Sequence, residues 1–459
     1  MADGNDNSVA TSAGTASADT TGEHLLPGAG SLPLARHDRT YYAATANRKT
    51  ARSPLLGREQ VDVCVIGGGF TGLSTALALA EAGISVCVLE SASIGFGASG
   101  RNGGQIVNGL NASLDKIQRQ FGTDAADFVG AHLTAGADLI RERIERYRID
   151  CDYRDGNLFA AYTGKQQREL EAKQKLWASH GMDQHELLDK AAIRKHVDSQ
   201  VYAGGMIDHA GGHLHPLNLA QGEADAIESL GGKVYELSEV IRIERRNRLH
   251  YAYTREGSVE AKRLVLCGNA YLQGLAPEIE NRILPATTQV MATERLGEER
   301  ARALLPTGLC VEDCRYILDY YRLSADHRLL FGGGTIYGGT DPEDISAKLR
   351  PNLEHVFPQL AGVRIDYAWS GRFAISYSRV PQLGRLQDGT IFAHGYSGHG
   401  VTGSHLFGAI IAEALQGNSK RFDLIAKLPY LPFPGGRTLR VPYSIAGSWW
   451  YGLRDRIGL

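Results

Sequence analysis

The sequence predicts an α/β fold in which a Rossmann-like domain is interrupted by a discontinuous second domain, an α+β substrate domain built on an antiparallel sheet. Residues 61–66 form a short apolar run that suits a strand buried on both faces, and a glycine-rich turn and a helix follow it. Residues 283–369 are instead organised as successive strands, with a helical stretch near 342–355. Because 459 residues are too many for one simple core, we expect two lobes.

Three glycines after the first strand carry the most informative pattern. Gly67, Gly69 and Gly72 spell G-x-G-x-x-G, a helix follows, and a second strand at 84–89 ends at Glu90. The first glycine permits a tight turn, the second lets the backbone approach a pyrophosphate, and the third allows close helix–strand packing. Phosphates would lie on the free N–H groups of the helix, and a carboxylate at Glu90 would accept from ribose hydroxyls. A lone glycine motif is weak, but with both strands and the acid in place it predicts a dinucleotide site.

Two further glycine-rich stretches follow predicted strands. The position of 91–105, after the second strand, favours a loop that wraps a planar cofactor ring over a merely flexible loop. A buried strand at 390–393 leads into 394–403, and a helix then runs through Gly417. This helix start is either a plain cap or a set of N–H groups that stabilises negative charge on a reduced flavin. The repetition of the glycine-rich turn at Gly398 favours the cofactor.

Composition and charge exclude several classes of protein. The chain is 43% hydrophobic and 22% charged, as ordinary globular proteins are, and its net charge of −2 argues against nucleic-acid binding. No apolar run is long enough to span a membrane. The six cysteines form no CxxC pair, which indicates a reducing, cytoplasmic compartment. Residues 1–39 have the composition of a disordered tail and lack the features of a signal peptide.

Three histidines, His209, His213 and His215, invite a metal site. Their glycine-rich surroundings offer no set of cysteines or carboxylates beyond Asp208, so we expect a structural turn and no metal.

Aromatic residues in the later strands have two interpretations of equal weight. They would be ordinary strand core, or they would line an amine site through cation–π contact. These residues are Tyr316, Tyr320, Tyr321, Tyr337 and Trp369. The sequence shows no convincing Ser-His-Asp or Cys-His signature.

The motifs from residue 41 to the end resemble the D-amino-acid-oxidase-like family of FAD-dependent oxidoreductases, which includes glycine and sarcosine oxidases. The glycine-rich stretches VDVCVIGGGFTGLS, GFGASGRNGGQ and GYSGHGV are shared across this family. Within it, YYAA, GGHLHPLNLA, WSGRFAISYSRVPQLGRL, FPGGRTLRVP and WWYGLRD resemble gamma-glutamylputrescine oxidoreductases more closely. The first and the last of these stretches are the more specific signals.

The resemblance implies FAD in an extended pose, with Glu90 on the adenosine ribose, Val240 at the adenine and 398–402 beneath the flavin ring. The expected cofactor-binding residues are Gly67, Gly69, Phe70, Thr71, Gly72, Glu90, Ser91, Ser99, Gly104, Gln105, Val240, Gly268, Gly398, Gly400, Val401 and Thr402. Some relatives attach FAD covalently through a cysteine or a histidine. Neither residue stands at the matching place in 324–328 or 99–102, so we expect noncovalent FAD.

We expect the two domains to alternate along the chain. The FAD-binding domain would comprise 40–150, 205–284 and 375–420, and the substrate domain would comprise 151–204 and 285–374. The remaining residues, 421–459, would form a C-terminal extension.

The resemblance also implies oxidation of an amine, namely gamma-glutamylputrescine or a related gamma-glutamyl amine. A hydride would move to the flavin, the resulting imine would hydrolyse to an aldehyde and ammonia, and oxygen would be reduced to hydrogen peroxide. Three other readings remain. They are a sarcosine- or D-amino-acid-type dehydrogenase that passes electrons to a quinone, an NAD-dependent dehydrogenase, and a non-catalytic subunit stabilised by FAD.

The pocket residues are less well defined than the cofactor site. We expect Tyr271, Tyr321, Trp369 and Arg322 to line it, and an arginine to bind the substrate's carboxylate. For that arginine Arg372 and Arg379 are candidates beside Arg322. The sequence identifies no catalytic side chain and no oligomeric state.

Overall fold

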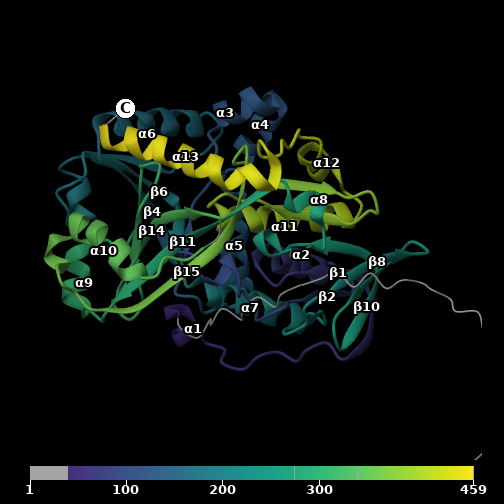
Figure 1. Ribbon diagram of the computed structural model, residues 1–459. Helices are drawn as coiled ribbons and strands as arrows, with labels where there is room; N and C mark the ends of the chain where they lie inside the picture. Colours follow the sequence, from purple (N-terminus) through teal and green to yellow (C-terminus); the bar gives the residue numbers. More distant parts are fainter. Residues whose placement is uncertain (1–39, 273, 339, 458–459) are drawn as a thin grey trace, which may run out of the picture. The chain divides into compact units, whose positions relative to one another are not determined.

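The fold is described from a computed structural model, which describes residues 40–457 except 273 and 339 (Figure 1). All of them belong to one compact unit, Arg36–Leu459. The tail expected at 1–39 lies outside the described residues. No helix in the described part of the chain is both long and apolar enough to cross a membrane.

The first sheet is built around parallel strands. Its order is β16-β17-β10-β1-β2-β7; the five strands from β17 to β7 are parallel, and β16 pairs antiparallel to β17. The hairpin β8–β9 extends from β10. The strands are β1 Gly57–Ile66, β2 Val86–Leu89, β7 Lys233–Tyr235, β8 Arg242–Arg246, β9 Leu249–Tyr253, β10 Gly257–Leu266, β16 Gln382–Arg385 and β17 Ile391–His394.

The second sheet is mostly antiparallel. Its order is β15-β11-β14-β13-β12-β4-β6-β3, with β5 paired to β6; only β12 and β4 run parallel among its described pairs. The strands are β3 Gln105–Ile106, β4 Arg154–Ala161, β5 His185–Asp189, β6 Gly204–His213, β11 Ile283–Thr293, β12 Cys310–Asp313, β13 Tyr320–Leu323, β14 Leu329–Tyr337 and β15 Ile365–Ser376. Parallel strands in one sheet and antiparallel strands in the other confirm the expected α/β fold class.

The helices differ in which sheet they cover. The buried helices α2 and α11 pack on each other and share the largest core cluster with β1, β2 and β17. The helix α10 covers one face of the second sheet, where Leu349 and Leu353 pack with Met291 and Phe331. The α-helices are α1 Tyr41–Thr45, α2 Phe70–Glu81, α3 Leu114–Phe121, α4 Thr123–Ala131, α5 Ala135–Tyr147, α6 Gly164–Ala178, α7 Pro216–Ser229, α8 Pro277–Glu280, α9 Glu298–Leu304, α10 Ile345–Val356, α11 Gly400–Leu415, α12 Lys420–Ala426 and α13 Gly436–Ile457. Short 3-10 helices lie at η2 Ala98–Gly100, η3 Ile193–Lys195, η4 Asn269–Tyr271 and η5 Pro358–Leu360.

The chain alternates between the two sheets, which Figure 1 shows as separate groups of strands. One difference from expectation concerns β6, since 205–213 was assigned to the FAD-binding domain but pairs with β4 and β5 in the second sheet. The glycines of β6 hide this pairing in the sequence, because they weaken the apolar pattern of a strand. The domain boundaries themselves stay predictions.

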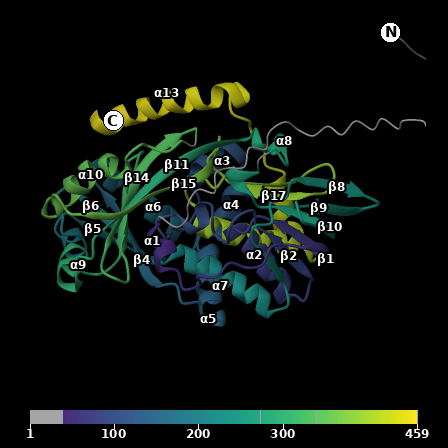
Figure 2. The ribbon, with the colours of Figure 1, turned by 60° about the horizontal axis from the view of Figure 1, so that its bottom comes forward.

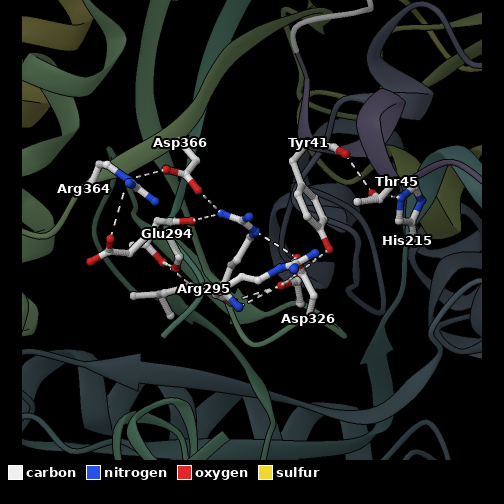
Figure 3. Close-up of polar contacts among 12 residues, drawn as sticks. Tyr41, Thr45, His215, Glu294, Arg295, Asp326, Arg364 and Asp366 are labelled. Atoms are coloured by element: carbon white, nitrogen blue, oxygen red, sulfur yellow. Dashed lines mark hydrogen bonds and ion pairs between the residues drawn. The ribbon is translucent and has the colours of Figure 1, made fainter. Parts of the chain in front are cut away.

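A polar network holds the short helix α1 against the second sheet (Figure 3). The Tyr41 hydroxyl donates to Asp326 at 2.7 Å, and Asp326 also pairs with Arg295 at 3.0 Å. At the other end of α1, the Thr45 hydroxyl lies 3.0 Å from Nε2 of His215, the N-cap residue of α7. The stretch YYAA therefore has a structural task, which is to clamp the start of the described chain onto both α7 and the β13–β14 hairpin.

Candidate functional site

The expected cofactor residues follow parallel strands that end at one edge of the first sheet. Gly67 follows β1 and donates its N–H to the carbonyl of Leu89, the last residue of β2, at 2.9 Å. Cys267 follows β10 and donates to Ile66 at 2.8 Å. Because the carboxyl ends of parallel strands meet at one edge, the structure brings together Gly67, Glu90 and Gly268.

The glycine motif has the geometry that its spacing predicts. Gly67 has a φ of +110°, which residues with a side chain rarely adopt. A Cβ on Gly72 would lie 2.0 Å from the Gly67 carbonyl oxygen, so only glycine lets α2 pack this closely. Gly69 is the N-cap of α2, and Phe70 and Thr71 form its first turn. The N–H of Phe70 points out of the helix start and donates to Oγ of Ser99 at 2.9 Å.

Glu90 lies buried against this turn. Its carboxylate accepts from the N–H groups of Gly68 at 2.7 Å and Ala92 at 2.9 Å, and from the Ser91 hydroxyl at 3.1 Å. Burial raises the pKa of Glu90 against the lowering effect of these hydrogen bonds, and the nearby Glu236 raises it further. The carboxylate is thus fixed beside the helix start, as a ribose-binding acid must be.

Val240 lies buried near the same edge. The loop before it is tied to the sheet by the Ser238 N–H, which donates to the Glu90 carbonyl at 2.8 Å. Sequence and structure therefore place Val240 beside the same strand ends.

The loop from 95 to 105 is anchored at both ends. The Gly95 N–H donates to the Gly68 carbonyl at 3.0 Å, and Leu214 donates to the Gly104 carbonyl at 2.8 Å. A Cβ on Gly104 would lie 2.1 Å from the Leu214 oxygen, so this approach requires glycine. The side chain of Gln105 donates to the Val311 carbonyl at 3.0 Å, so it ties the loop to β12.

Arg322 and Trp369 support this loop instead of lining a pocket. The buried guanidinium of Arg322 donates to the carbonyls of Gly103 at 2.6 Å, Leu214 at 2.8 Å and Leu323 at 3.1 Å. The buried indole N–H of Trp369 donates to the Arg101 carbonyl at 2.9 Å. Both residues were expected in the pocket; in the structure the Trp369 indole and Nε of Arg322 donate to carbonyls of the loop, and the other Arg322 nitrogens donate to Leu214, Leu323 and the Tyr42 hydroxyl.

The second glycine-rich turn places the start of α11 at the same edge. Gly398 is exposed with a φ of +108°, and Gly400, Val401 and Thr402 form the first turn of the helix. The Thr402 hydroxyl donates to the Val107 carbonyl at 2.7 Å, which fixes the helix start to the segment after β3. Tyr396 was not expected here; its hydroxyl lies 2.8 Å from that of Thr71 and links α11's turn to α2.

A charged cluster lies buried between α2 and α11, and no sequence pattern predicts it. Arg143 of α5 donates to Glu223 of α7 at 2.9 Å and to the Ser74 carbonyl in α2 at 3.1 Å. Nε2 of His405 in α11 lies 3.1 Å from the Glu223 carboxylate, and its Nδ1 lies 2.5 Å from the Val401 carbonyl. Burial opposes ionisation of Glu223, but the charges of His405 and Arg143 lower its pKa overall. The cluster joins α2 to the first turn of α11 across residues far apart in sequence.

Successive residues of β13 face opposite ways, so that Tyr320 faces the loop 95–105 and Tyr321 faces away from it. The Tyr321 ring packs under α10 against Phe357, and its hydroxyl lies 2.8 Å from that of Tyr202. Tyr321 is therefore core, which corrects its assignment to the pocket. Its neighbour Tyr320 points the other way and lies so close to Gly103 that a Cβ there would be 2.6 Å from the ring. Burial raises the pKa of Tyr320, so the phenol stays protonated.

Tyr271 lies on the other side of the same loop. Its half-buried ring contacts Gly97 and makes an edge contact with Phe96. The Arg372 guanidinium lies 5.7 Å from the ring centroid of Tyr271. Arg379 is farther along the chain and donates to the Tyr316 hydroxyl at 3.1 Å.

The three histidines have separate surroundings. His213 lies 3.0 Å from the Gly308 carbonyl, His215 caps α7, and His209 faces Glu186. Burial lowers the pKa of His213 and His215 to about 3, so both rings are neutral at pH 7. No cluster of metal-ligating side chains occurs in the described ranges.

The strand ends, the two glycine-rich helix starts and the anchored loop define a dinucleotide-binding oxidoreductase. A family model described as FAD dependent oxidoreductase matches residues 62–414, and the chain belongs to this family. It is 52% identical to the gamma-glutamylputrescine oxidoreductase of Escherichia coli (strain K12), over 93% of this chain and 100% of that protein. It is 38% identical to the probable oxidoreductase OrdL of Haemophilus influenzae, over 92% of this chain and 98% of that one.

Solved structures show the same fold. The glycine oxidase of Geobacillus kaustophilus matches with a TM-score of 0.67 at 22% identity, over 81% of this chain and 99% of that chain. The L-proline dehydrogenase of P. horikoshii matches with a TM-score of 0.66 at 20% identity, over 85% and 99%. The family, the fold and FAD as the cofactor, which the motifs predicted, are thus confirmed.

Proposed function

We propose that the chain oxidises gamma-glutamylputrescine or a related gamma-glutamyl amine to an aldehyde and ammonia, with oxygen reduced to hydrogen peroxide. The choice of substrate rests on one observation, the 52% identity over the whole length of a gamma-glutamylputrescine oxidoreductase. The chemistry fits, because FAD supplies the acceptor for a hydride from the carbon beside the amine nitrogen. Water then converts the resulting imine into the aldehyde and ammonia.

The protein's contribution is to bind and orient. We assign the pyrophosphate to the start of α2 and the ribose to Glu90, because helix N–H groups and a buried carboxylate suit these partners. We place the ring at the start of α11, whose free N–H groups favour negative charge there. The other cofactor residues predicted from sequence are part of the same proposal.

The substrate would lie against the loop, which Tyr320 contacts at Gly103 on one side and Tyr271 contacts at Gly97 on the other. Its glutamyl carboxylate calls for an arginine, and Arg322 is unsuited because it is held by backbone carbonyls. Arg372, beside Tyr271, is the better candidate, with Arg379 as the second. Both lie in or just after β15, on one of the stretches whose sequence resembles the gamma-glutamylputrescine enzymes.

The test is anaerobic mixing of the FAD-loaded protein with gamma-glutamylputrescine while the visible flavin absorbance is followed. Rapid bleaching, with colour and peroxide returning in air, is the expected result. Bleaching only with sarcosine or a D-amino acid would overturn the substrate. Bleaching that air reverses slowly but a quinone reverses fast would overturn oxygen as the acceptor. Flavin that stays oxidised with every amine would overturn catalysis itself.

Attachment of the cofactor is tested separately. Acid precipitation is expected to leave the yellow colour in the supernatant, because FAD is held without a covalent bond. Colour in the pellet would contradict this.

A further inference from the structure

The C-terminal helix α13 (Gly436–Ile457) lies on the body of the protein by one face only. Arg440 donates to the carbonyls of Glu280 at 3.0 Å and Ile283 at 2.5 Å, and Val441 packs beside Tyr337 in a small apolar cluster. Figure 2 shows α13 as a rod that runs along the outside of the ribbon near β11 and β14. Its other face is turned to solvent.

That outer face is apolar, which reverses the usual arrangement of a surface helix. Leu439, Tyr443 and Trp450 follow each other at helical spacing, so their side chains form one stripe. Tyr443 is 61%, Trp450 61% and the adjacent Trp449 77% exposed. The sequence continues this spacing to Leu453 and Ile457. A stripe of this kind on a folded surface marks a contact that another body covers.

The charge of the helix indicates what that body is. Besides Arg440, which holds the helix on the body, the sequence of α13 carries three arginines, Arg437, Arg454 and Arg456, against the single acid Asp455, whereas the whole chain has a net charge of −2. Arginines at both ends of a helix that exposes two tryptophans and a tyrosine suit the boundary between anionic headgroups and acyl chains. Tryptophan and tyrosine rings favour that boundary because one end of each ring system is apolar and the other is polar.

We propose that α13 binds the surface of an anionic lipid bilayer and lies in its interface plane, with the stripe Leu439–Tyr443–Trp449–Trp450 inserted. It does not cross the bilayer, since the described part of the helix lacks the continuous apolar length for that. A second copy of the chain is a weaker partner, because one short stripe offers far fewer residues than the 20–30 a side, roughly, of a stable dimer.

The four tryptophans give the experiment an internal reporter. Trp177 and Trp369 are buried, so a change in tryptophan emission on adding vesicles reports on Trp449 and Trp450. The FAD-loaded full chain is mixed with vesicles of phosphatidylcholine and phosphatidylglycerol in equal parts, and with vesicles of phosphatidylcholine alone. We expect co-sedimentation and a blue shift of the emission with the anionic vesicles, and at least tenfold weaker binding to the neutral ones or in high salt.

Two variants make the result specific. Trp449→Ser/Trp450→Ser is expected to lose at least tenfold in vesicle affinity while it keeps its flavin spectrum and its turnover in vesicle-free buffer. The control Leu56→Ser/Ile241→Ser removes exposed apolar side chains elsewhere and is expected to bind as the wild type does.

Failure of the wild type to bind anionic vesicles would overturn the proposal. So would equal loss of binding in both double variants. If sedimentation instead shows a dimer that Trp449→Ser/Trp450→Ser abolishes, without vesicle binding, the stripe covers a second copy and the membrane proposal is wrong.

Discussion

The two sheets contribute different kinds of chemical group to the proposed site. The first sheet contributes mainly backbone: strand ends, glycines without side chains and helix N–H groups, together with the charged side chain of Glu90. The second sheet contributes side chains, such as Tyr320 and Arg322, that press on the loop 95–105 from behind or face across it. A backbone site depends on local spacing, whereas a side-chain wall depends on which face each strand turns inward.

This difference decides where substitutions act. At the edge of the first sheet, the space for a single carbon atom is limiting. On the second sheet, the side chains that hold the loop act through hydrogen bonds, so their removal costs hydrogen bonds. Five substitutions in four tests, from the largest expected effect to the smallest, examine the comparison.

Gly72→Ala tests the backbone site. The new Cβ would meet the Gly67 carbonyl oxygen at 2.0 Å, so α2 must move away from β1, and we expect a loss of roughly 3 kcal/mol or more in stability and no retained FAD. Thermal unfolding and the flavin spectrum measure both. Gly164→Ala, at the open start of α6, is the matched control and should change neither. A Gly72→Ala protein that stays yellow and stable would refute the close packing.

Arg322→Met tests the support of the loop. It leaves the carbonyls of Gly103 and Leu214 without their donor in a buried place, which costs roughly 2–3 kcal/mol. FAD affinity should fall with it, because the loop loses its anchor. If the variant instead keeps its stability and only its KM for the amine rises, Arg322 lines the substrate pocket. Denaturant unfolding alongside steady-state kinetics separates the two.

Glu90→Gln tests the effect of Glu90 on FAD binding separately from its effect on the stability of the fold. The raised pKa of Glu90 means that its carboxylate lowers the stability of the FAD-free protein at pH 7. That cost vanishes below about pH 4, where the carboxyl is protonated in both the folded and the unfolded state. Glutamine removes this charge but places an NH2 group where the carboxylate accepts from an N–H group, so the stability of the variant should change less between pH 4 and pH 7 than that of the wild type. Its FAD affinity should fall roughly tenfold or more, since a neutral amide accepts more weakly from the ribose.

Tyr321→Phe and Tyr320→Phe compare the two faces of one strand. Removing the Tyr321 hydroxyl breaks its contact with Tyr202 and should cost about 1 kcal/mol of stability with unchanged turnover. Removing the Tyr320 hydroxyl should slow anaerobic flavin bleaching with less effect on stability. The reverse pattern would show that β13 turns its other face to the site.

The sequence predicts the first sheet's contribution well because that contribution is local. The strand, the glycine turn, α2 and Glu90 lie within about thirty residues, and each glycine is needed for a contact that its spacing already implies. The fold class and the cofactor follow from this unit.

The second sheet is harder to predict because its contacts join residues that are distant in the sequence. Tyr320 and Tyr321 are equivalent by composition, and only the pairing of β13 with β12 and β14 decides which one faces the loop. Arg322 reaches partners 219 and 108 residues away, and the cluster of Arg143, Glu223 and His405 joins three helices. No periodicity in the sequence predicts such pairs. The aromatic residues of α13 are apparent in the sequence, but the sequence does not show that they lie on an exposed face.

The order of strands in the first sheet also bears on how the protein is made. The neighbours β2, β1, β10 and β17 come from the beginning, the middle and the end of the chain, so the sheet is completed only when β17 has left the ribosome. About 300 residues separate β2 from β17, which at a synthesis rate of roughly 5–20 residues per second is a delay of roughly 15–60 s. For that interval the apolar strand β1 lacks part of its sheet, and FAD has no complete site to stabilise it. FAD that binds at these strand ends would therefore act only late in synthesis.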